Sequence, residues 1–468
     1  MEAKRTDITD TPETLTPTAE ISPSPIPSPS PSEKQSIFTA GATSFLPSFL
    51  KPLTPLSFAR AQATNTTPPP PPDGGLKAWT QVLVGHLVLF NTWGFINSFG
   101  FFESYYIATL HQLPSAISWI VSIQVFLLSF IGSVSGRATD AGWYRLVLGL
   151  GCFFQLLGMF MTSLATSYWE VFLAQGVCCG IGHGLVWTPT VSLISTYFAR
   201  KRAVAVTVVL AGSSTGGIIF PLVAQQLFPK VGFGWTVRVM AFVVMFNVAV
   251  ILALARTRLP PRKTGPLFEW AAFREPDYAL FVVGTFLILW STYFAYYYLN
   301  SYATSVLHTN AATSLDLLYT INATGIPGRI LPALLSDFLL GPSNTFITLA
   351  FLAGMLLYVW IAVKSIGGMF AFAAVYGLVA AGVQGMFAPA LASMTKDLSK
   401  MGARMGMALS VVSVAFLTSA PLAGALIQRD HGGYLYAQIW GGTSLVVGAS
   451  IVVLARVPRY GWDFSRKM

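Results

Sequence analysis

Charged residues are scarce in this chain of 468 residues, because Asp, Glu, Lys and Arg together make up only 10% of it. An average soluble protein carries about 25%. So few charges cannot solvate the surface of a soluble protein of this length, whereas a surface that faces lipid needs none. The hydrophobic fraction is 54%. The composition argues against a soluble globular enzyme and predicts a membrane protein.

Cysteine is also rare, and the sequence lacks the common catalytic and cofactor motifs. The three cysteines, Cys152, Cys178 and Cys179, lie inside apolar segments, so they form neither a disulfide framework nor a spaced metal site. The glycine-rich runs lie inside apolar stretches and not between a strand and a helix, so no phosphate-binding loop is visible. We therefore expect no cofactor, no metal and no enzyme activity.

The net charge of +10 comes from short Lys and Arg clusters between apolar runs. This placement is typical of membrane topology signals, and it argues against nucleic-acid binding. If both termini are cytosolic, the cations gather in the cytosolic loops, and the opposite loops hold only Lys230, Lys364 and Arg429. The pattern predicts a multi-pass protein of the plasma membrane with both termini in the cytosol. It carries no signal for an oligomeric state.

Apolar runs of about 20 residues, long enough to cross the bilayer core as helices, recur along the chain from Trp79. The sequence predicts twelve membrane helices, hence an all-α membrane protein with two six-helix halves. The predicted spans run approximately over 79–104, 115–136, 145–165, 169–196, 203–227, 234–255, 278–303, 313–339, 344–363, 367–394, 404–427 and 434–456.

The predicted organisation has five parts, separated by composition and charge. Residues 1–72 are rich in Pro, Ser and Thr, a composition that predicts a disordered cytosolic tail. The N-terminal half covers 73–256, a basic cytosolic loop covers 257–277, the C-terminal half covers 278–457, and 458–468 form a second cytosolic tail.

One motif occurs after the second predicted span and again after the eighth. The first copy is GRATDAGWYR, with Gly136, Arg137, Asp140 and Arg145, and the second is GRILPALLSD, with Gly328, Arg329 and Asp337. The pair resembles the loop motif of the major facilitator superfamily, whose fold repeats one six-helix unit. We expect these residues to gate the transporter, with glycines allowing close helix approach and charges pairing in one conformation.

Two further stretches narrow the resemblance. The segment PPDGGLKAWTQVL, 71–83, precedes and enters the first span, and YFARKRAVAVTVVLAGSSTGGIIFPLV, 197–223, covers the fourth cytosolic loop and the fifth span. Both are similar to signatures of the monocarboxylate porter family. The residues at these positions are most similar to those of its fungal branch. The resemblance implies transport of a small-molecule solute by alternating access.

Arg329 lies deep in the eighth predicted span, where a charge is costly unless it is paired or hydrated. The resemblance implies that it binds a carboxylate of the solute, and pairing with Asp337 in a gate is the alternative. The porters place an aspartate four residues before this arginine and a lysine in the first span, but this chain has Gly325 and Asn97 there. These departures argue against proton symport of the porters' kind. Glu103, Asp316 and Glu170 remain as candidate proton sites, and a solvated helix end is the alternative for each.

The resemblance to the facilitator fold implies that the first, fourth, seventh and tenth spans line the central pathway, and polar and aromatic residues at helical spacing in these spans outline a cavity. Besides Arg329, the predicted substrate-binding residues are Asn97, His183, Trp187, Trp290, Tyr293, Tyr297, Asn300 and Gln384. A single deep cation among aromatic rings favours an anionic, carboxylated solute.

The sequence therefore predicts a secondary-active or facilitative transporter of a small organic metabolite, with efflux of a fungal secondary metabolite favoured. Import of a monocarboxylate or a vitamin-like nutrient is one alternative, and a non-transporting membrane receptor or sensor is another. The gate motif in both halves argues against a receptor, because a receptor need not alternate between two conformations.

Overall fold

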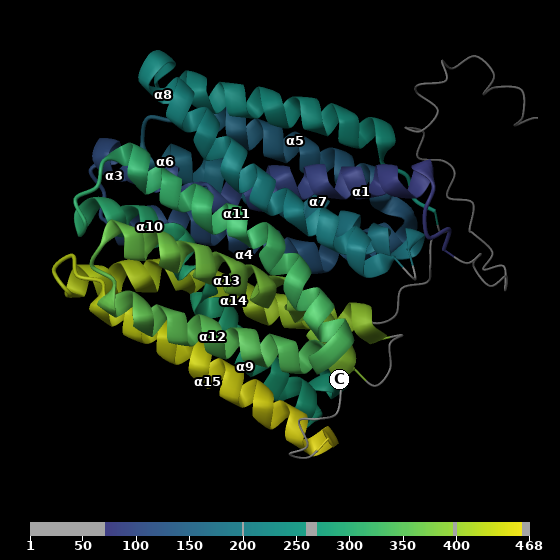
Figure 1. Cartoon of the computed structure of the whole chain (residues 1–468). Helices are drawn as coiled ribbons and strands as arrows, with labels where there is room; N and C mark the ends of the chain where they lie inside the picture. The colour runs from purple at the N-terminus through teal and green to yellow at the C-terminus, as the bar shows by residue number, and fades with distance from the viewer. Residues whose placement is uncertain (1–70, 199–200, 259–268, 396–399, 461–468) are drawn as a thin grey trace, which may run out of the picture. The chain divides into compact units, whose positions relative to one another are not determined.

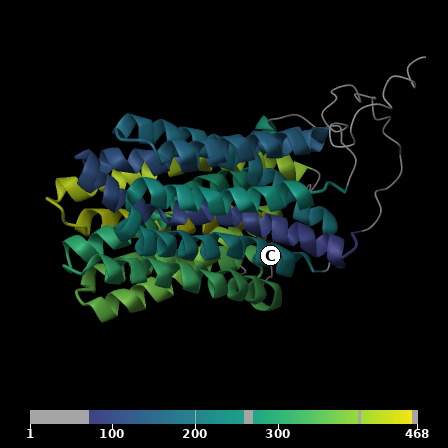
Figure 2. The ribbon, with the colours of Figure 1, turned by 90° about the horizontal axis from the view of Figure 1, so that it is seen from above.

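The computed structural model describes residues 71–198, 201–258, 269–395 and 400–460, and these ranges contain helices and no strand. All of them belong to one compact unit, Asn65–Met468. The helices lie side by side, as two views show (Figures 1 and 2). Residues 1–70 and 461–468 of the predicted tails and 259–268 of the predicted loop 257–277 fall outside the described residues, and α15 continues three residues into the predicted tail 458–468. The predicted division into domains stays a prediction.

The helices follow one another along the chain with short connections. We call α1–α8 the N-terminal set and α9–α15 the C-terminal set. The N-terminal set comprises α1 (Leu76–Leu89), η2 (Phe90–Gly94), α2 (Phe95–Asn97), α3 (Phe99–Leu110), α4 (Pro114–Ala138), η3 (Thr139–Trp143), α5 (Tyr144–Thr162), α6 (Tyr168–Val171), η4 (Phe172–Cys178), α7 (Cys179–Tyr197) and α8 (Arg202–Leu254). The C-terminal set comprises α9 (Pro276–Thr292), α10 (Phe294–Ser305), α11 (Ala311–Leu335), η6 (Ser336–Leu340), α12 (Pro342–Ala362), α13 (Ile366–Met394), α14 (Met401–Arg429) and α15 (Leu435–Tyr460), preceded by η5 (Trp270–Arg274).

By length and composition, nine of the described helices can cross a membrane, and ten can if the bent pair Leu76–Asn97 and Phe99–Leu110 counts as one crossing. An all-α membrane fold is therefore confirmed. The predicted eighth span, α11, is not among these nine, since it carries Asp316, Asn322 and Arg329 among its apolar residues. The count of twelve crossings stays a prediction.

Helix α8 covers two predicted spans in one run of 53 residues. At 1.5 Å per residue such a helix would be about 80 Å long, more than twice the bilayer core of about 30 Å. It is interrupted at Gly232, whose φ of 73° and ψ of 176° are not helical. This backbone conformation favours glycine because the residue has no Cβ. The turn predicted between 227 and 234 is thus present as a break inside α8.

Several helices begin where their sequence supplies a cap. Proline occupies the first turn of α4, α9 and α12, where its missing N–H removes no hydrogen bond. The Asn310 side chain accepts a hydrogen bond from Thr313 N at the start of α11. Ser365 does the same for Gly368 N at the start of α13. These caps fix where the helices start and leave their apolar faces to pack against one another.

The first helix of each set is broken part-way along. In the N-terminal set, the five-residue turn η2 and the non-helical Ser98 (φ −86°, ψ 2°) separate α1 from α3, with a bend of 40° between the two parts. In the C-terminal set, Tyr293 separates α9 from α10. The sequence predicts neither break, because no proline or paired glycine marks Ser98 or Tyr293. Both breaks flank the site described below.

Candidate functional site

A cavity of about 90 Å³ lies between the N-terminal and C-terminal sets. Both sets contribute lining residues, from α1, η2, α7 and α8 on one side and from α9, α11, α13 and α14 on the other. Its polar lining consists of Arg329, Gln384 and Ser213. The apolar lining consists of Leu89, Trp93, Trp187, Leu210, Leu289, Tyr293, Phe387, Leu409 and Phe416. Of the described residues that line this cavity, Arg329 is the only charged one.

Arg329 is 6% exposed, and the hydrogen-bond partners of its guanidinium are neutral. Nη1 donates hydrogen bonds to Ser214 Oγ at 2.7 Å and to the Gly325 carbonyl at 3.0 Å, and Nη2 donates to Gln384 Oε1 at 3.3 Å. The Gln384 Nε2 has no hydrogen-bond partner among the described residues. A buried charge without an opposite charge is unfavourable by several kcal/mol. An anion in the cavity could therefore pair with the Arg329 guanidinium and accept a hydrogen bond from Gln384 Nε2.

Asp337, the alternative partner of Arg329, lies on η6 with its side chain exposed. Within the described ranges, no ion pair joins the two residues, and the guanidinium faces α8 and α13. Both suggested roles of Arg329 stay predictions, and in this conformation its surroundings are those of the cavity.

The aromatic wall joins the two sets. Trp93 stacks on Tyr293, with ring centroids 5.6 Å apart and planes 19° apart. Trp187 meets Trp93 edge-on at 5.7 Å, and Phe416 meets Tyr293 edge-on at 5.6 Å. Offset stacks and edge-to-face pairs of this kind are the favourable aromatic geometries.

Beyond these rings, α3 and α10 hold the two sets together at one end of the bundle, which we call the α3/α10 end. Asn300 Nδ2 donates to Ser104 Oγ at 2.7 Å and to the Gly100 carbonyl at 3.2 Å. Ser301 Oγ donates to Glu103 Oε2 at 3.4 Å. The Glu103 side chain is 1% exposed. Asn300, predicted to bind substrate, thus contributes to the contact between the sets.

The structure places three other predicted binding residues away from the cavity lining. His183 is fully buried beside Gln124 of α4, and its Nε2 has no partner among the described residues. Asn97 is buried in α2, and its Oδ1 likewise has none. Trp290 turns to α14 and α15, where Nε1 donates to Thr418 Oγ1 at 2.9 Å and the ring meets Trp440. Trp290 therefore faces the neighbouring helices α14 and α15 and not the cavity that Tyr293 lines.

Tyr297 is buried directly behind Tyr293, with ring centroids 6.0 Å apart, and its ring meets Phe99 of the other set at 6.3 Å. The predicted residues that do line the cavity are Arg329, Trp187, Tyr293 and Gln384. One residue from each of α7, α11 and α13 and one at the α9–α10 junction thus line the same cavity, and their role in substrate binding stays a prediction.

The predicted gating residues occupy helix ends and helix contacts. Arg137 lines a small recess between α4 and α14, close to where Ser410 Oγ donates to Ser133 Oγ at 3.1 Å. A Cβ on Gly328 would lie 2.3 Å from the Leu378 carbonyl, so α11 and α13 touch there. Gly136 packs near Thr188 of α7, and Arg145 is exposed. The Asp140 side chain lies outside the described part of the chain. A gating role for this set stays a prediction.

The two segments that resemble porter signatures, 71–83 and 197–223, contact each other in the structure. Asp73 N donates to the Tyr197 carbonyl at 3.1 Å, and Lys201 N donates to Asp73 Oδ1 at 3.4 Å. Near this contact, Tyr197 Oη donates to the Arg256 carbonyl at 2.9 Å, and Arg258 Nη1 donates to the Thr196 carbonyl at 2.5 Å. The start of α1, the end of α7 and the end of α8 are therefore fastened together.

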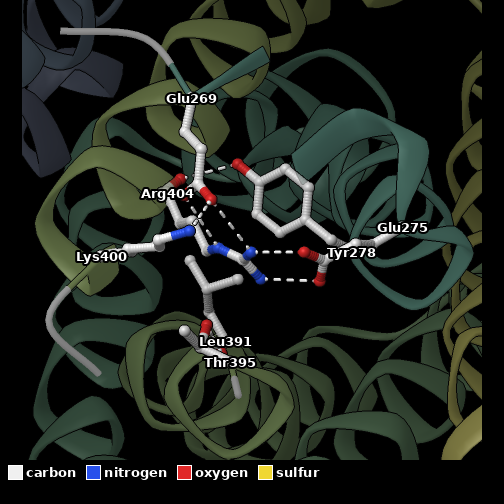
Figure 3. Close-up of polar contacts among 7 residues, drawn as sticks. All are labelled: Glu269, Glu275, Tyr278, Leu391, Thr395, Lys400 and Arg404. Carbon is white, nitrogen blue, oxygen red and sulfur yellow. Dashed lines mark hydrogen bonds and ion pairs between the residues drawn. The ribbon is translucent and has the colours of Figure 1, made fainter. Parts of the chain in front are cut away.

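An ionic cluster fastens the corresponding part of the C-terminal set (Figure 3). Arg404 of α14 forms ion pairs with Glu275 at 2.6 Å and with Glu269 at 3.3 Å, and Lys400 pairs with Glu269 at 2.8 Å. The Tyr278 hydroxyl donates to the Arg404 carbonyl at 2.8 Å. The hydrogen bond from Lys400, with Arg404 beside it, lowers the pKa of the Glu269 carboxyl. The cluster ties the segment before α9 to the start of α14.

Comparison with known proteins decides the family. The sequence profile of the Major Facilitator Superfamily matches residues 83–386, more than half of the chain. The chain belongs to the Major Facilitator Superfamily. This confirms the superfamily inferred from the repeated loop motif, and membrane transport of a small solute follows from it. The finer resemblance to monocarboxylate porters stays a prediction.

Relatives of this superfamily member come from filamentous fungi. A protein of Gibberella zeae named MFS-type transporter is 42% identical over 82% of this chain and 88% of the relative. The aspyridones efflux protein of Emericella nidulans is 32% identical over 82% of this chain and 79% of the relative. The agnestins efflux protein of Paecilomyces divaricatus is 30% identical over 87% and 93%.

Two aromatic residues that line the cavity of this superfamily member were missed from sequence, Trp93 and Phe416. In the first span, polarity favoured Asn97 and not Trp93. The neighbouring polar residue Asn91 is buried against Asn247 of α8, whose Nδ2 donates to Asn91 Oδ1 at 2.8 Å. Phe416 lies in α14, a helix not expected to line the pathway. In the structure, Trp93 and Tyr293 lie equally far from the helix starts Leu76 and Pro276, but the predicted spans, which begin at 79 and 278, do not show this correspondence.

Proposed function

We propose that this transporter exports a small organic anion by alternating access, and that Arg329 binds the anionic group. The observation that carries the proposal is the buried guanidinium that lines the cavity with only neutral partners. A bound carboxylate would supply the missing charge and two acceptor oxygens for the planar fork. The names of two relatives, which mention efflux of fungal metabolites, support the direction.

The proposal includes the plasma membrane as location and the cytosol as the side of both termini. In a strain that lacks this gene, the exported metabolite should accumulate inside the cells several-fold and fall in the medium. A fluorescent protein fused after Met468 should mark the cell boundary and resist protease added to intact cells. An importer would give the opposite metabolite shift, depletion inside and excess in the medium, and would overturn the proposed direction.

We infer further that the α3/α10 end closes only when Glu103 is neutral. Glu103 is 1% exposed, and among the described residues its carboxyl accepts one hydrogen bond, from Ser301 Oγ at 3.4 Å. The titratable groups near it are the phenols of Tyr298 and Tyr434, and no Lys, Arg or His of the described ranges forms an ion pair with it. An ionised carboxylate in this place is unfavourable by several kcal/mol. Closure therefore takes up a proton.

Glu103→Gln should remove the dependence of transport on external pH. When the α3/α10 end is open, the Glu103 carboxyl is exposed to water and, with its ordinary pKa of about 4.3, is already ionised at an external pH of about 5.5; raising that pH to about 8 makes the proton uptake that closure requires less favourable, and so opposes closure. The amide stays neutral, so transport by the variant in proteoliposomes should be flat over this range. The control is Asp316→Asn, because Asp316 is exposed at the start of α11. Equal pH profiles for native protein and Glu103→Gln would contradict the inference.

A further inference from the structure

The stacked pair Trp93 and Tyr293 contributes one ring from each helix set. Trp93 belongs to the five-residue turn η2, and Tyr293 lies at the junction of α9 and α10. Their rings are 5.6 Å apart at an angle of 19°, and Trp187 and Phe416 meet Trp93 edge-on at 5.7 and 6.3 Å. Both rings also line the cavity that holds Arg329.

This pair lies between the cavity and the α3/α10 end. One helical turn before it, Leu89 and Leu289 line the cavity. Beyond it, Tyr297 and Phe99 are buried against each other across the two sets, with ring centroids 6.3 Å apart. A solute that leaves the cavity toward the α3/α10 end therefore has to part Trp93 from Tyr293.

Parting the two rings removes a favourable stack, and the character of the solute decides whether it is replaced. A flat conjugated ring that enters between them restores an offset stack on each side. A saturated ring of the same size restores apolar contact but no ring-to-ring geometry. A ligand shifts a conformational equilibrium only by its difference in affinity between the two states. Separation of the two sets is thus assisted by a flat conjugated solute and not by a saturated one.

We propose that Trp93 and Tyr293 select planar, conjugated organic anions, whose ring enters between the two side chains while the anionic group stays on Arg329. The inference rests on the proposed role of Arg329 and adds the chemical class of the solute. Because the rings come from different helix sets, they contact the solute at the point where the two sets separate.

The test uses two carboxylates of the same skeleton and charge, 2-naphthoate and decahydro-2-naphthoate, with neutral 2-naphthamide as a third probe. Binding to the purified full-length protein in lipid nanodiscs is measured by calorimetry. The native protein should bind 2-naphthoate about tenfold more tightly than the saturated acid, the size of effect that aromatic pairing supports. Trp93→Leu should remove this discrimination by weakening 2-naphthoate alone, and Trp93→Phe should keep part of it.

The matched control is Trp290→Leu, because Trp290 precedes Tyr293 by one helical turn but faces Thr418 and Trp440. It should leave the discrimination unchanged. Equal affinity of the native protein for both acids, or an equal loss of both in Trp93→Leu, overturns the selection by the stack. If the two acids bind equally but lose binding in Arg329→Gln, the anion site survives and only the present inference fails. If Arg329→Gln binds both acids as well as the native protein does, or 2-naphthamide equals 2-naphthoate, the proposed anion site fails too.

Discussion

Arg329→Lys is expected to weaken binding of the exported anion by about ten- to hundredfold, the range given by the loss of hydrogen bonds to a charged group. Lysine keeps the charge but loses the planar fork that holds a carboxylate through two parallel hydrogen bonds. It also cannot reach Ser214, Gly325 and Gln384 together, as the guanidinium does. The measurement is equilibrium binding of the metabolite identified from the deletion strain, with transport followed in parallel.

Asp337→Asn separates the two roles suggested for Arg329. Asp337 is exposed on η6 and lies away from the cavity lining. The Asp337→Asn variant should therefore bind the solute within about twofold of the native affinity, and it should transport the solute more slowly if Asp337 serves a gate. If Arg329→Lys and Asp337→Asn both leave binding intact and slow transport alike, Arg329 belongs to the gate. An anionic solute then loses its main support.

Gly216→Val should prevent most of the protein from folding. A Cβ on Gly216 of α8 would lie 2.5 Å from the Phe90 carbonyl and 2.8 Å from Gly94 Cα. Those are backbone atoms, so only a shift of α8 away from η2 makes room. Overpacking by even small groups destabilises by about 1–3 kcal/mol, and a branched side chain between two backbones exceeds this. The measurement is the yield and thermal unfolding of detergent-solubilised protein.

Gly149→Ala is the matched control, because nothing lies within 4 Å of a Cβ built on Gly149 in α5. It should fold as well as the native protein or slightly better, since alanine is the stronger helix former. Gly216→Ala should fall between the two, with partial loss of stability. A Gly216→Val protein as stable as the native one would show that α8 and η2 do not approach this closely in the membrane.

The fold could be predicted from sequence because long apolar runs leave few alternatives in lipid. The predicted seventh span began at 278, and α9 begins at Pro276, where a proline marks the first turn. The breaks at Ser98 and Tyr293 could not be predicted, since each depends on packing across the two sets and not on a local breaker. The turn predicted between 227 and 234 differs from these breaks, because it contains a glycine, and the structure has it as the single non-helical residue Gly232 within α8.

The cavity was predictable where polarity and helical phase agree. Burying the polar side chains of Arg329 and Gln384 at membrane depth is unfavourable unless each has a polar partner, and this explains why they lie near each other. Trp93 could not be assigned in this way, because the five-residue turn η2 shifts the helical phase in which it lies. Asn97 and His183 have the right polarity, but the structure buries them between helices.

Each helix set fastens its own end of the segment that links them. Arg256 and Arg258 bond to Tyr197 and Thr196 of the N-terminal set, and Glu269 bonds to Lys400 and Arg404 of the C-terminal set. Only residues 259–268 lie between these anchors, a stretch that spans about 35 Å when fully extended. The number of residues in this link therefore sets an upper limit on how far the two anchor points can separate during one transport cycle.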